Sequence, residues 1–524
     1  MNQSLLSKFS KSHERTLESS VKEKYYLGFD AGTQSVKVAV YDQNMTCVAK
    51  ASNKTTIDSP KAGWVNMDAD EYFELAKKGM CDCIKQLKKK NISTKLIRAI
   101  MGDGIICGIV GVDEEGKAIT PYINYLDSRT QSDVDYINNL NLSIWGEETG
   151  NPEASCMFPA MHARWFLCND ENFRKKGAKF MHNAPYILSR LAGLTSKDAF
   201  VDWGTMSGWG LGYHVHEKEW SDRQLKILGI DKKYLPKIVK PWDIIGKLSE
   251  DIAKEVGLEA GIPICAGAGD TMQSMLGSGV SEPGKAVDVA GTCAMFCVST
   301  DEIIPELSKK GNGLIFNSGT LEDTYFYWGF VRTGGLSLRW FKDNICKNQD
   351  DKYYEVLSEE AKKVEPGCRG IFFLPYLTGG YGEYSNVKAC FLNMNLDTDQ
   401  YVMWRAVLEA IAYDYLEVIN TYRNKGINID RITITEGGSR NELWNQIKAD
   451  ILDSEVITLE TAGGAIVTDC IIGSYAIGDI SDLKMALNSS IKIANRYIPK
   501  SINTNFYKKQ YKLKNDILNV LKKI

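Results

Sequence analysis

Two turns that lie more than 250 residues apart combine glycine and threonine with a nearby aspartate. The first reads Tyr26-Leu-Gly-Phe-Asp30-Ala-Gly32-Thr33, and the second Ala286-Val-Asp288-Val-Ala-Gly291-Thr292. Glycine lets a backbone approach a ligand, threonine supplies a hydroxyl donor, and an aspartate at a strand end offers a carboxylate to a metal or water. Two such turns facing each other would hold the phosphates of a nucleotide, whereas either one alone is also typical of a simple hairpin.

Asp270 ends another glycine-rich segment, Gly267-Ala-Gly-Asp270, which follows an apolar strand. Open α/β folds bind ligands at the ends of their strands, so this carboxylate is placed to act as a general base. An aspartate at the start of a helix also serves as an N-cap. The two roles can coexist, and both stay open at this stage.

The segment Gly437-Gly-Ser-Arg-Asn441 is a further glycine turn, between an apolar strand and a helix. Unpaired amides point out of a helix N-terminus and bind phosphate or ribose there. A role in binding the nucleotide is better supported because this is the third glycine-rich strand end, after the turns at Asp30 and Asp288. By contrast, Gly279-Val-Ser-Glu-Pro-Gly-Lys-Ala286 only approaches a P-loop, because it lacks the final hydroxyl residue and leads into a strand.

Composition describes an ordinary soluble globular protein. The 524 residues are 44% hydrophobic and 25% charged, with a formal net charge of −3, which favours neither nucleic acid nor an anionic membrane as the main partner. No signal-peptide core or apolar run of 18 residues occurs. The 13 cysteines follow no disulfide or zinc pattern, so we expect a reduced, cytoplasmic protein.

Periodicity in the sequence predicts α/β lobes. We expect hairpin strands over 25–50, an amphipathic helix over 68–90, a strand, turn and strand over 96–112, and a helix over 400–422. The chain is too long for one core. We therefore predict a mobile tail over 1–24, lobes over 25–280 and 281–500, and a terminal helix over 501–524, packed on its own lobe or on a second subunit of a homodimer.

The order of these motifs resembles the FGGY family of carbohydrate kinases, most of all its xylulose-kinase-like members, from about residue 25 to about 480. The resemblance rests on the following segments: Asp30-Ala-Gly-Thr33 with Ser35 and Lys37, Gly63-Trp64-Val with Asp68, Tyr125-Leu-Asp127-Ser-Arg129, Gly267-Ala-Gly-Asp270, Gly291-Thr292, Arg405-Ala-Val-Leu-Glu409-Ala, and Gly437-Gly-Ser-Arg-Asn-Glu-Leu-Trp444 with Ala449-Asp450.

This resemblance implies two actin-like (ribonuclease-H-like) ATPase domains with a central cleft that binds ATP and Mg²⁺. It implies transfer of the ATP γ-phosphate to a sugar hydroxyl, with Asp270 as the base and Asp30 and Asp270 at the magnesium. Positions implied for ATP and its phosphates are Gly32, Thr33, Gln34, Ser35, Lys37, Gly291, Thr292, Gly437, Gly438, Ser439 and Asn441. Positions implied for the sugar are Trp64, Asp103, Gly104, Cys107, Asp127, Arg129 and Asp270.

The sequence departs from the family where the sugar is chosen. Xylulose kinases carry Gly-Gln-Met-His-Gly where this chain has Gly104-Ile-Ile-Cys-Gly108, so two hydrogen-bonding side chains are missing. Hydroxyls left without partners each cost on the order of 1 kcal/mol or more. Gly102-Asp103-Gly104 instead looks similar to erythritol kinases of the family, and Asp103 is able to accept hydroxyl hydrogen bonds.

The leading expectation is therefore a kinase for a pentulose such as xylulose, with erythritol, another polyol or a different ketose as the alternative. A non-catalytic sugar sensor or an actin-like ATPase of the same fold is a remoter alternative. Asp127 and Arg129 are substrate contacts or an internal ion pair, and Trp64 stacks on a sugar or packs in the core. The sequence leaves these choices open.

Overall fold

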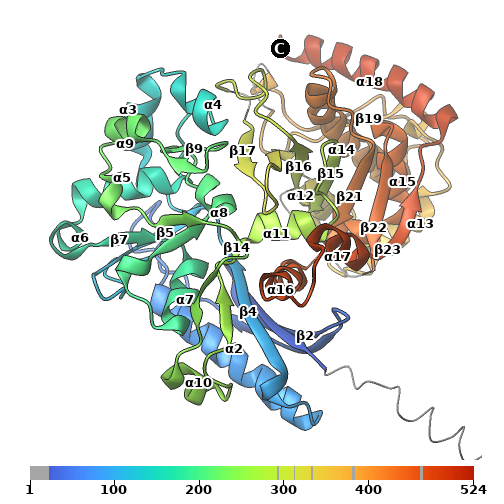
Figure 1. Cartoon of the computed structure of the whole chain (residues 1–524). Helices are drawn as coiled ribbons and strands as arrows, with labels where there is room; N and C mark the ends of the chain where they lie inside the picture. The colour runs from blue at the N-terminus through green and yellow to red at the C-terminus, as the bar shows by residue number, and fades with distance from the viewer. Residues whose placement is uncertain are drawn as a thin grey trace, which may run out of the picture.

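Two large sheets form the centres of two lobes (Figure 1). The computed structural model describes residues 23–291, 294–311, 313–331, 334–380, 384–460 and 464–523. We call residues 23–269 the first lobe and residues 285–523 the second lobe; helix α11 (Asp270–Gly277) begins where the first ends. The predicted mobile tail lies almost wholly outside the described residues, although Lys24 is described and forms an ion pair with Asp479 of the second lobe.

The first sheet combines an antiparallel meander with parallel strands. Its strands, from edge to edge, are β12 (Ile244–Lys247), β13 (Pro263–Cys265), β4 (Ile97–Gly104), β1 (Tyr25–Ala31), β2 (Ser35–Asp42) and β3 (Cys47–Lys54), with β14 (Ala268–Gly269) also paired to β4. Strands β1, β2 and β3 are antiparallel neighbours, and β4 lies parallel to β1 on its other side.

The second sheet repeats this order. Its strands are β17 (Ile315–Ser318), β18 (Tyr325–Val331), β16 (Ala294–Thr300), β15 (Lys285–Ala290), β21 (Arg431–Thr435), β22 (Glu455–Leu459) and β23 (Ile493–Tyr497). Here β15 pairs antiparallel with β16 and parallel with β21, as β1 pairs with β2 and β4. The two hairpins predicted from the sequence thus occupy equivalent places in two copies of one topology.

Helices cover the outer face of each sheet. In the first lobe these are α2 (Ala69–Lys89), α7 (Asn183–Ala192) and α10 (Glu250–Val256), and in the second α13 (Tyr353–Ala361), α14 (Gln400–Arg423), α15 (Glu442–Leu452) and α18 (Ser501–Leu521). Asp68 caps α2 by accepting from the amides of Asp70 and Glu71, and its apolar side chains face the sheet. The helices predicted over 68–90 and 400–422 are confirmed.

Two helices that the duplication relates meet between the sheets. Helix α11 follows β14, α16 (Ala465–Ala476) follows β22, and the two pack on each other. Helix α16 belongs to the second lobe but lies against β1 and β4 of the first, as Figure 1 shows at the centre of the molecule. A Cβ added at Gly28 of β1 would lie 2.6 Å from Ile466, so glycine permits this close packing.

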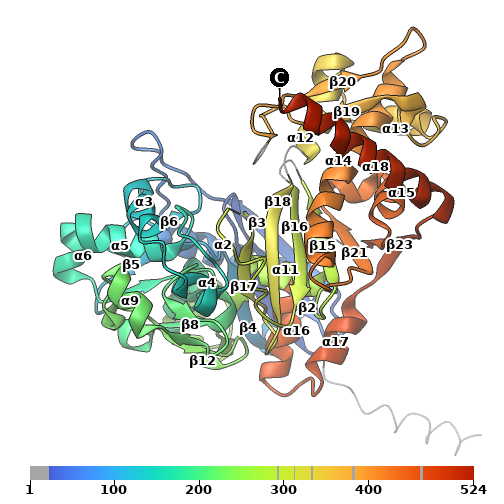
Figure 2. The same ribbon diagram turned by 90° about the horizontal axis from the view of Figure 1, so that it is seen from above.

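Apart from α7, the chain between β4 and β12 forms a separate layer at the side of the first lobe (Figure 2). Its elements are β5 (Gly108–Val112), β6 (Ile123–Asn124), α3 (Gln131–Asn139), α4 (Ile144–Thr149), α5 (Pro159–Asn169), α6 (Glu171–Lys176), β7 (Lys179–Met181), β8 (Phe200–Asp202), α8 (Trp203–Ser207), β9 (Tyr213–His214), β10 (Glu219–Trp220), α9 (Asp222–Leu228) and β11 (Lys237–Val239). The strand, turn and strand predicted over 96–112 are present, but β5 pairs with β6 and β7 instead of β4.

An edge strand of the second sheet is bound by the first lobe. Asn151 donates to the carbonyl of Phe316 in β17 at 3.0 Å, and the Phe316 amide donates to its Oδ1 at 2.8 Å. The Ser318 amide of the same strand donates to Ser207 Oγ at 3.0 Å. The two lobes are therefore joined at a second place, distant in sequence from α16.

The terminal helix packs on its own lobe. Lys514 of α18 forms an ion pair with Asp414 of α14 at 3.1 Å, and both side chains are buried. Tyr507 donates to Glu409 at 2.7 Å, and Arg405 also binds Glu409. Of the two packings considered for residues 501–524, the structure has the intramolecular one.

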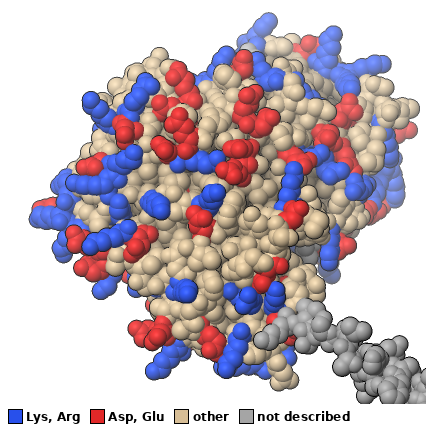
Figure 3. Space-filling view, in the orientation of Figure 1, with Lys and Arg blue, Asp and Glu red and all other residues tan. Residues whose placement is uncertain are grey.

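Charged side chains of both signs are interspersed over the face seen in Figure 3, without one large patch of a single sign. Among the described residues, no helix has both the length and the apolar character needed to cross a membrane.

Candidate active site

Asp30 lies at the end of β1 on the face that looks towards the second lobe. Strand residues alternate between faces, and Phe29 and Ala31 belong to the core under α2, so Asp30 points the other way. Its carboxylate accepts from Lys37 of β2 at 2.8 Å, and the Lys37 side chain is half exposed. Burial lowers the pKa of Lys37, but the charge and hydrogen bond of Asp30, with the charges of Asp103 and Glu436, together raise it above its ordinary value, so this lysine stays charged.

Asp270 begins α11 beside Asp30. Gly267 has a φ of +83° and passes so close to Gly102 that a Cβ would lie 2.1 Å from the Gly102 carbonyl oxygen, which is why the approach to Asp270 needs glycine. The Asp270 carboxylate accepts from the amide and the hydroxyl of Thr271. Burial and then the charge of Asp30 raise the pKa of Asp270 to about 7, against the bonds from Thr271. Such a group exchanges a proton near neutral pH. The N-cap of α11 is Gly269, so the N-cap role considered for Asp270 is wrong.

Asp103 lies between these two aspartates. It stands next to Asp30 in the register of β4 on β1 and next to Ala268 in that of β14 on β4. Its carboxyl is fully buried, and neither oxygen has a donor among the described residues. Burial, and then the charges of Asp469 and Asp30, raise the pKa of Asp103 well above its ordinary value.

The glycine turns of both lobes lie near one another. Gly438 packs on Ala290, the residue before Gly291, with only 2.3 Å between the Ala290 Cβ and a Cβ added at Gly438. The charge of Glu436, next to Gly437, acts on Lys37 of the first lobe. The turn at Gly437 therefore lies beside the strand end before Gly291, and Glu436 lies near the hairpin of Asp30 and Lys37.

The remaining positions implied for ATP differ in their hydrogen bonds and in their exposure. Thr33 shares a hydroxyl hydrogen bond of 3.0 Å with Tyr125, and Gly32 and Ser35 close the β1–β2 turn by a backbone bond, which leaves Gln34 exposed. Asn441 caps α15 by accepting from the Trp444 amide and donates to Ser358, while Ser439 donates to the Glu436 carbonyl. Thr292 lies outside the described residues.

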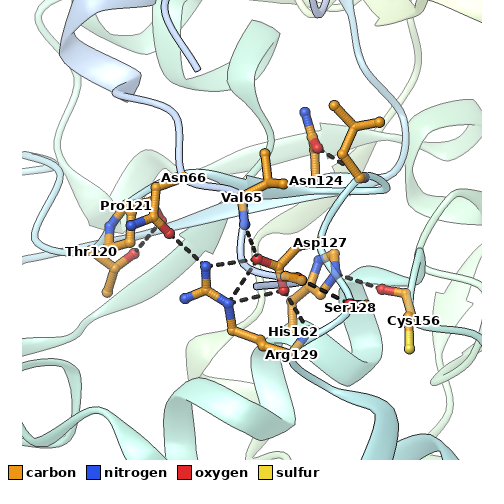
Figure 4. A network of polar contacts seen from close by, with 12 residues as sticks. Val65, Asn66, Thr120, Pro121, Asn124, Asp127, Ser128, Arg129, Cys156 and His162 are labelled. Atoms are coloured by element: carbon orange, nitrogen blue, oxygen red, sulfur yellow. Dashed lines mark hydrogen bonds and ion pairs between the residues drawn. The ribbon is translucent and has the colours of Figure 1, made fainter. Parts of the chain in front are cut away.

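Asp127 and Arg129 form an internal ion pair, one of the two alternatives that the sequence left open (Figure 4). The guanidinium binds both Asp127 oxygens and donates to Asn66, and both charged groups are buried. It also lies 4.1 Å from the ring centroid of Trp64, which packs edge-on against Trp165. Nε and Nη2 of Arg129 and both oxygens of Asp127 are thus used within the cluster.

Gly104 and Cys107, two of the positions implied for the sugar, are both buried. The Cys107 thiol is buried and donates to the Gly208 carbonyl at 3.7 Å, and burial raises its pKa to about 12. A Cβ at Gly104 would lie 2.6 Å from the Asn183 side chain. Cys107 therefore presents a small neutral surface, and Gly104 makes room for Asn183.

Asp469 of α16 was missed by the sequence predictions. It is fully buried, and burial raises its pKa to about 8. The signal was present: α16 reads Ala465-Ile-Val-Thr-Asp-Cys-Ile-Ile-Gly-Ser-Tyr-Ala, and a single carboxylate in such an apolar helix is rarely buried without a partner.

Magnesium, which the resemblance implies, is compatible with the residues present. Among the described residues no group of three or more His, Cys, Asp or Glu side chains is arranged to hold a metal. However, Mg²⁺ usually binds through one or two carboxylates together with substrate phosphates. The neighbouring carboxylates of Asp30 and Asp270 fit that requirement.

Comparison with known proteins agrees with this geometry. Residues 25–277 match the N-terminal domain of the FGGY family of carbohydrate kinases, and residues 286–477 match its C-terminal domain. The chain belongs to the FGGY family of carbohydrate kinases. It is therefore an ATP-dependent sugar kinase.

Relatives of this FGGY kinase carry different substrate names. Gluconokinase of Bacillus subtilis is 27% identical over 489 residues, which cover 91% of this chain and 92% of that protein. Xylulose kinase of the same organism is 24% identical over 497 residues, covering 94% and 96%. The crystal structure of xylulose kinase from Rhodospirillum rubrum superposes with a TM-score of 0.85 at 21% identity, covering 95% of this chain and 99% of that one, which confirms the predicted two-domain actin-like fold.

Proposed function

We propose that this kinase transfers the γ-phosphate of ATP to a hydroxyl of a neutral polyhydroxy acceptor, with a pentulose such as xylulose first, and that Asp270 is the general base. The observation that carries the proposal is the Asp270 carboxyl, which is buried beside Asp30 and has a pKa of about 7. A base with such a pKa accepts a hydroxyl proton at neutral pH and remains partly ionised beforehand.

In this proposal the two domains predicted from the sequence, 25–280 and 281–500, bind different substrates. The first lobe holds the acceptor near Asp103 and Asp270, and the turns at Gly291 and Gly437 hold the nucleotide. Lys37 lies beside Asp30 and close to Glu436 of the other lobe, where it neutralises phosphate charge. Magnesium bound at Asp30 and Asp270 would further neutralise the phosphates, since phosphoryl transfer depends on positioning and charge stabilisation.

The charges of the described site favour a neutral acceptor over an acid such as gluconate. Asp30 and the partly ionised Asp270 place negative charge beside the space for the acceptor. The cations Lys37 and Arg129 are each bound to an aspartate already. A substrate carboxylate would meet repulsion there, because like charges at short range in a low-dielectric site cost several kcal/mol.

A polyol such as erythritol is the second candidate acceptor, and Asp103 is the observation that favours it. Its two carboxyl oxygens have no donor among the described residues, and sugar or polyol hydroxyls would supply one. Cys107 and the neighbouring Ile106 are buried in an apolar cluster with Met272 of α11, and Ile106 packs on Gly269 beside Asp270. Apolar neighbours suit a short acceptor with few further polar groups.

ADP formation with Mg²⁺ and a panel of acceptors tests the substrate. Xylulose, ribulose, fructose, erythritol, xylitol, glycerol and gluconate are compared at equal concentration. We expect a pentulose to give the highest kcat/KM. A stronger response to erythritol would favour the polyol, gluconate as the best acceptor would overturn the charge argument, and ATP binding without turnover would favour a sensor.

Replacement of the base tests the mechanism. Asp270→Asn keeps the size of the side chain but cannot take a proton, so kcat should fall at least 1,000-fold, about 4 kcal/mol of barrier. Nucleotide affinity, measured by calorimetry, should change less than about threefold. A residual rate within about tenfold of the wild type would show that another group takes the proton.

A further inference from the structure

The β1–β2 turn, residues 31–35, is bound to the first lobe through each of its backbone carbonyl groups. In chain order, these carbonyls accept from Asn183 Nδ2 at 2.7 Å, Tyr72 Oη at 3.2 Å, Thr55 Oγ1 at 2.6 Å, the Thr55 amide at 3.2 Å and the Gly32 amide at 3.1 Å. A short turn at the edge of a site could have been left to water. Here it is held from three sides.

The side chains that hold the turn come from three elements. Tyr72 lies in α2, Asn183 begins α7, and Thr55 follows β3. Tyr72 and Asn183 are buried, so their polar groups depend on partners inside the protein. The Tyr72 hydroxyl also lies 3.3 Å from the sulfur of Met67, but a thioether is a weak acceptor. The turn carbonyl is therefore the main partner of this hydroxyl.

The held carbonyls determine where the amides of the turn point. All described peptide bonds are trans, and in a planar trans peptide the N–H points opposite to the C=O. The Gly32 carbonyl, which Tyr72 holds, shares its peptide unit with the Thr33 amide. The Thr33 carbonyl, which Thr55 holds, shares its unit with the Gln34 amide. Since both carbonyls point into the first lobe, both amides point away from it.

These two amides are free to bind a ligand. Within the part of the chain that the structure describes, neither the Thr33 nor the Gln34 amide donates to a backbone or side-chain acceptor. Gln34 is exposed and Thr33 is half-buried. Successive backbone N–H groups that point outward from a turn form a concave site for an anion.

We propose that Tyr72 and Thr55 are positioning residues for ATP: by holding two carbonyl groups of the β1–β2 turn inside the first lobe, they aim the two adjacent amides at a phosphate of the nucleotide. This role rests on the proposed function, and it adds residues that touch no substrate themselves. Without either hydroxyl, a peptide unit of the turn can rotate and present its carbonyl oxygen, which repels a phosphate.

Calorimetric binding to the whole protein, with Mg²⁺ and without an acceptor, tests the inference. Tyr72→Phe and Thr55→Val each remove one hydroxyl and keep the shape of the side chain. In each variant the Kd of a non-hydrolysable ATP analogue should rise about tenfold, because hydrogen bonds to a charged group are strong. The Kd of adenosine, which has no phosphate, should stay within about twofold. Thr55→Ser retains the hydroxyl and should restore analogue binding to within about twofold of the wild type.

Tyr186→Phe is the matched control. Tyr186 is also buried, and its hydroxyl donates to Asp70 of α2 at 2.7 Å, so this change removes a hydroxyl bound to the same helix but not to the turn. Both Kd values should remain those of the wild type. Equal losses for the analogue and adenosine, no loss for either, or the same loss in Tyr186→Phe would overturn the positioning role.

Steady-state kinetics with the best acceptor of the panel add a second readout. The ATP KM of Tyr72→Phe should rise about tenfold while the acceptor KM stays within about twofold. An equal rise in the acceptor KM would overturn a role specific to the nucleotide. A wild-type protein that binds the analogue but phosphorylates no acceptor would overturn the proposed function, and the calorimetric comparison would still decide the role of Tyr72 and Thr55. A wild-type protein that does not bind the analogue would overturn both.

Discussion

The two hairpins of the duplicated topology use their aspartates in opposite ways. In β1–β2, Asp30 faces the other lobe and pairs with the half-exposed Lys37. In β15–β16, Asp288 is buried, binds Lys448 of α15 and accepts from Tyr415 of α14. The ammonium of Lys448 also lies 3.6 Å from the ring centroid of Trp444. One hairpin thus presents its carboxylate to the candidate site, and the other places it in the core.

A difference of one residue explains this contrast. Asp30 stands two positions before Gly32, whereas Asp288 stands three positions before Gly291. Side chains alternate between the faces of a strand, so an odd shift moves the carboxylate to the other face. Asp288 therefore takes the place that Phe29 has in the first hairpin, and Val289 takes that of Asp30. Related backbones can thus carry unrelated chemistry.

The largest effect on stability should come from breaking the buried pair. Asp288→Asn leaves Lys448 without its counter-charge in the core, which typically costs about 3–5 kcal/mol. Urea unfolding should show this loss, while kcat per folded molecule stays within about twofold. A loss of kcat with unchanged stability would assign Asp288 to the site after all.

The reverse pattern is expected for the first hairpin. Asp30→Asn should lower kcat/KM at least 100-fold, about 2.7 kcal/mol of barrier, because the carboxylate beside Asp270 and the phosphates is lost. The free energy of unfolding should change by less than about 1 kcal/mol, because Lys37 is half exposed. A destabilisation as large as that of Asp288→Asn would remove the distinction between the hairpins.

Replacing both members of the buried pair should have a smaller effect. Asp288→Leu combined with Lys448→Met leaves no unpaired charge, so the free energy of unfolding should lie within about 2 kcal/mol of the wild type or exceed it. Steady-state kinetics should remain close to those of the wild type. A loss of more than 4 kcal/mol would mean that the pair stabilises the lobe beyond charge compensation.

The smallest effect concerns pH. The base must be deprotonated, so kcat/KM should fall about tenfold per pH unit below the Asp270 pKa of about 7. Asp30 raises that pKa, so Asp30→Asn should shift the midpoint of the profile to lower pH. Asp288→Asn should leave the midpoint unchanged. Measuring kcat/KM for the acceptor as a function of pH in each variant checks the direction of this shift.

Much of the fold was predictable because it depends on local patterns. The hairpins, the helices over 68–90 and 400–422 and the glycine before Asp270 are set by periodicity and turn chemistry. Side chains alternate between the two faces of a strand, so the number of residues from Asp30 to Gly32 and from Asp288 to Gly291 predicts which face of the sheet each carboxylate lies on. The structure, in turn, places Asp30 and Asp270 on either side of the end of β4, near enough for the charge of Asp30 to raise the Asp270 pKa.

The rest depends on contacts between distant segments. Asp127 and Arg129 are two residues apart, so their spacing alone could not tell an internal pair from a ligand pair; the burial beside Trp64 and Trp165 decides it. Helix α16 belongs to the other lobe and lies far from β4 in the sequence, yet it packs on that strand, which ends near Asp103. No local pattern links them, since the contact arises only when α16 crosses to the first sheet.

The edge strand β17 has a consequence for the lobes as separate pieces. Its outward amides and carbonyl are occupied by Asn151 and Ser207 of the first lobe. Without that lobe, β17 would expose an unpaired backbone row flanked by Phe316, which is the template on which β-proteins associate into aggregates. The second lobe expressed alone should therefore precipitate, and the hydrogen bonds that join the lobes also protect the protein in solution from self-association.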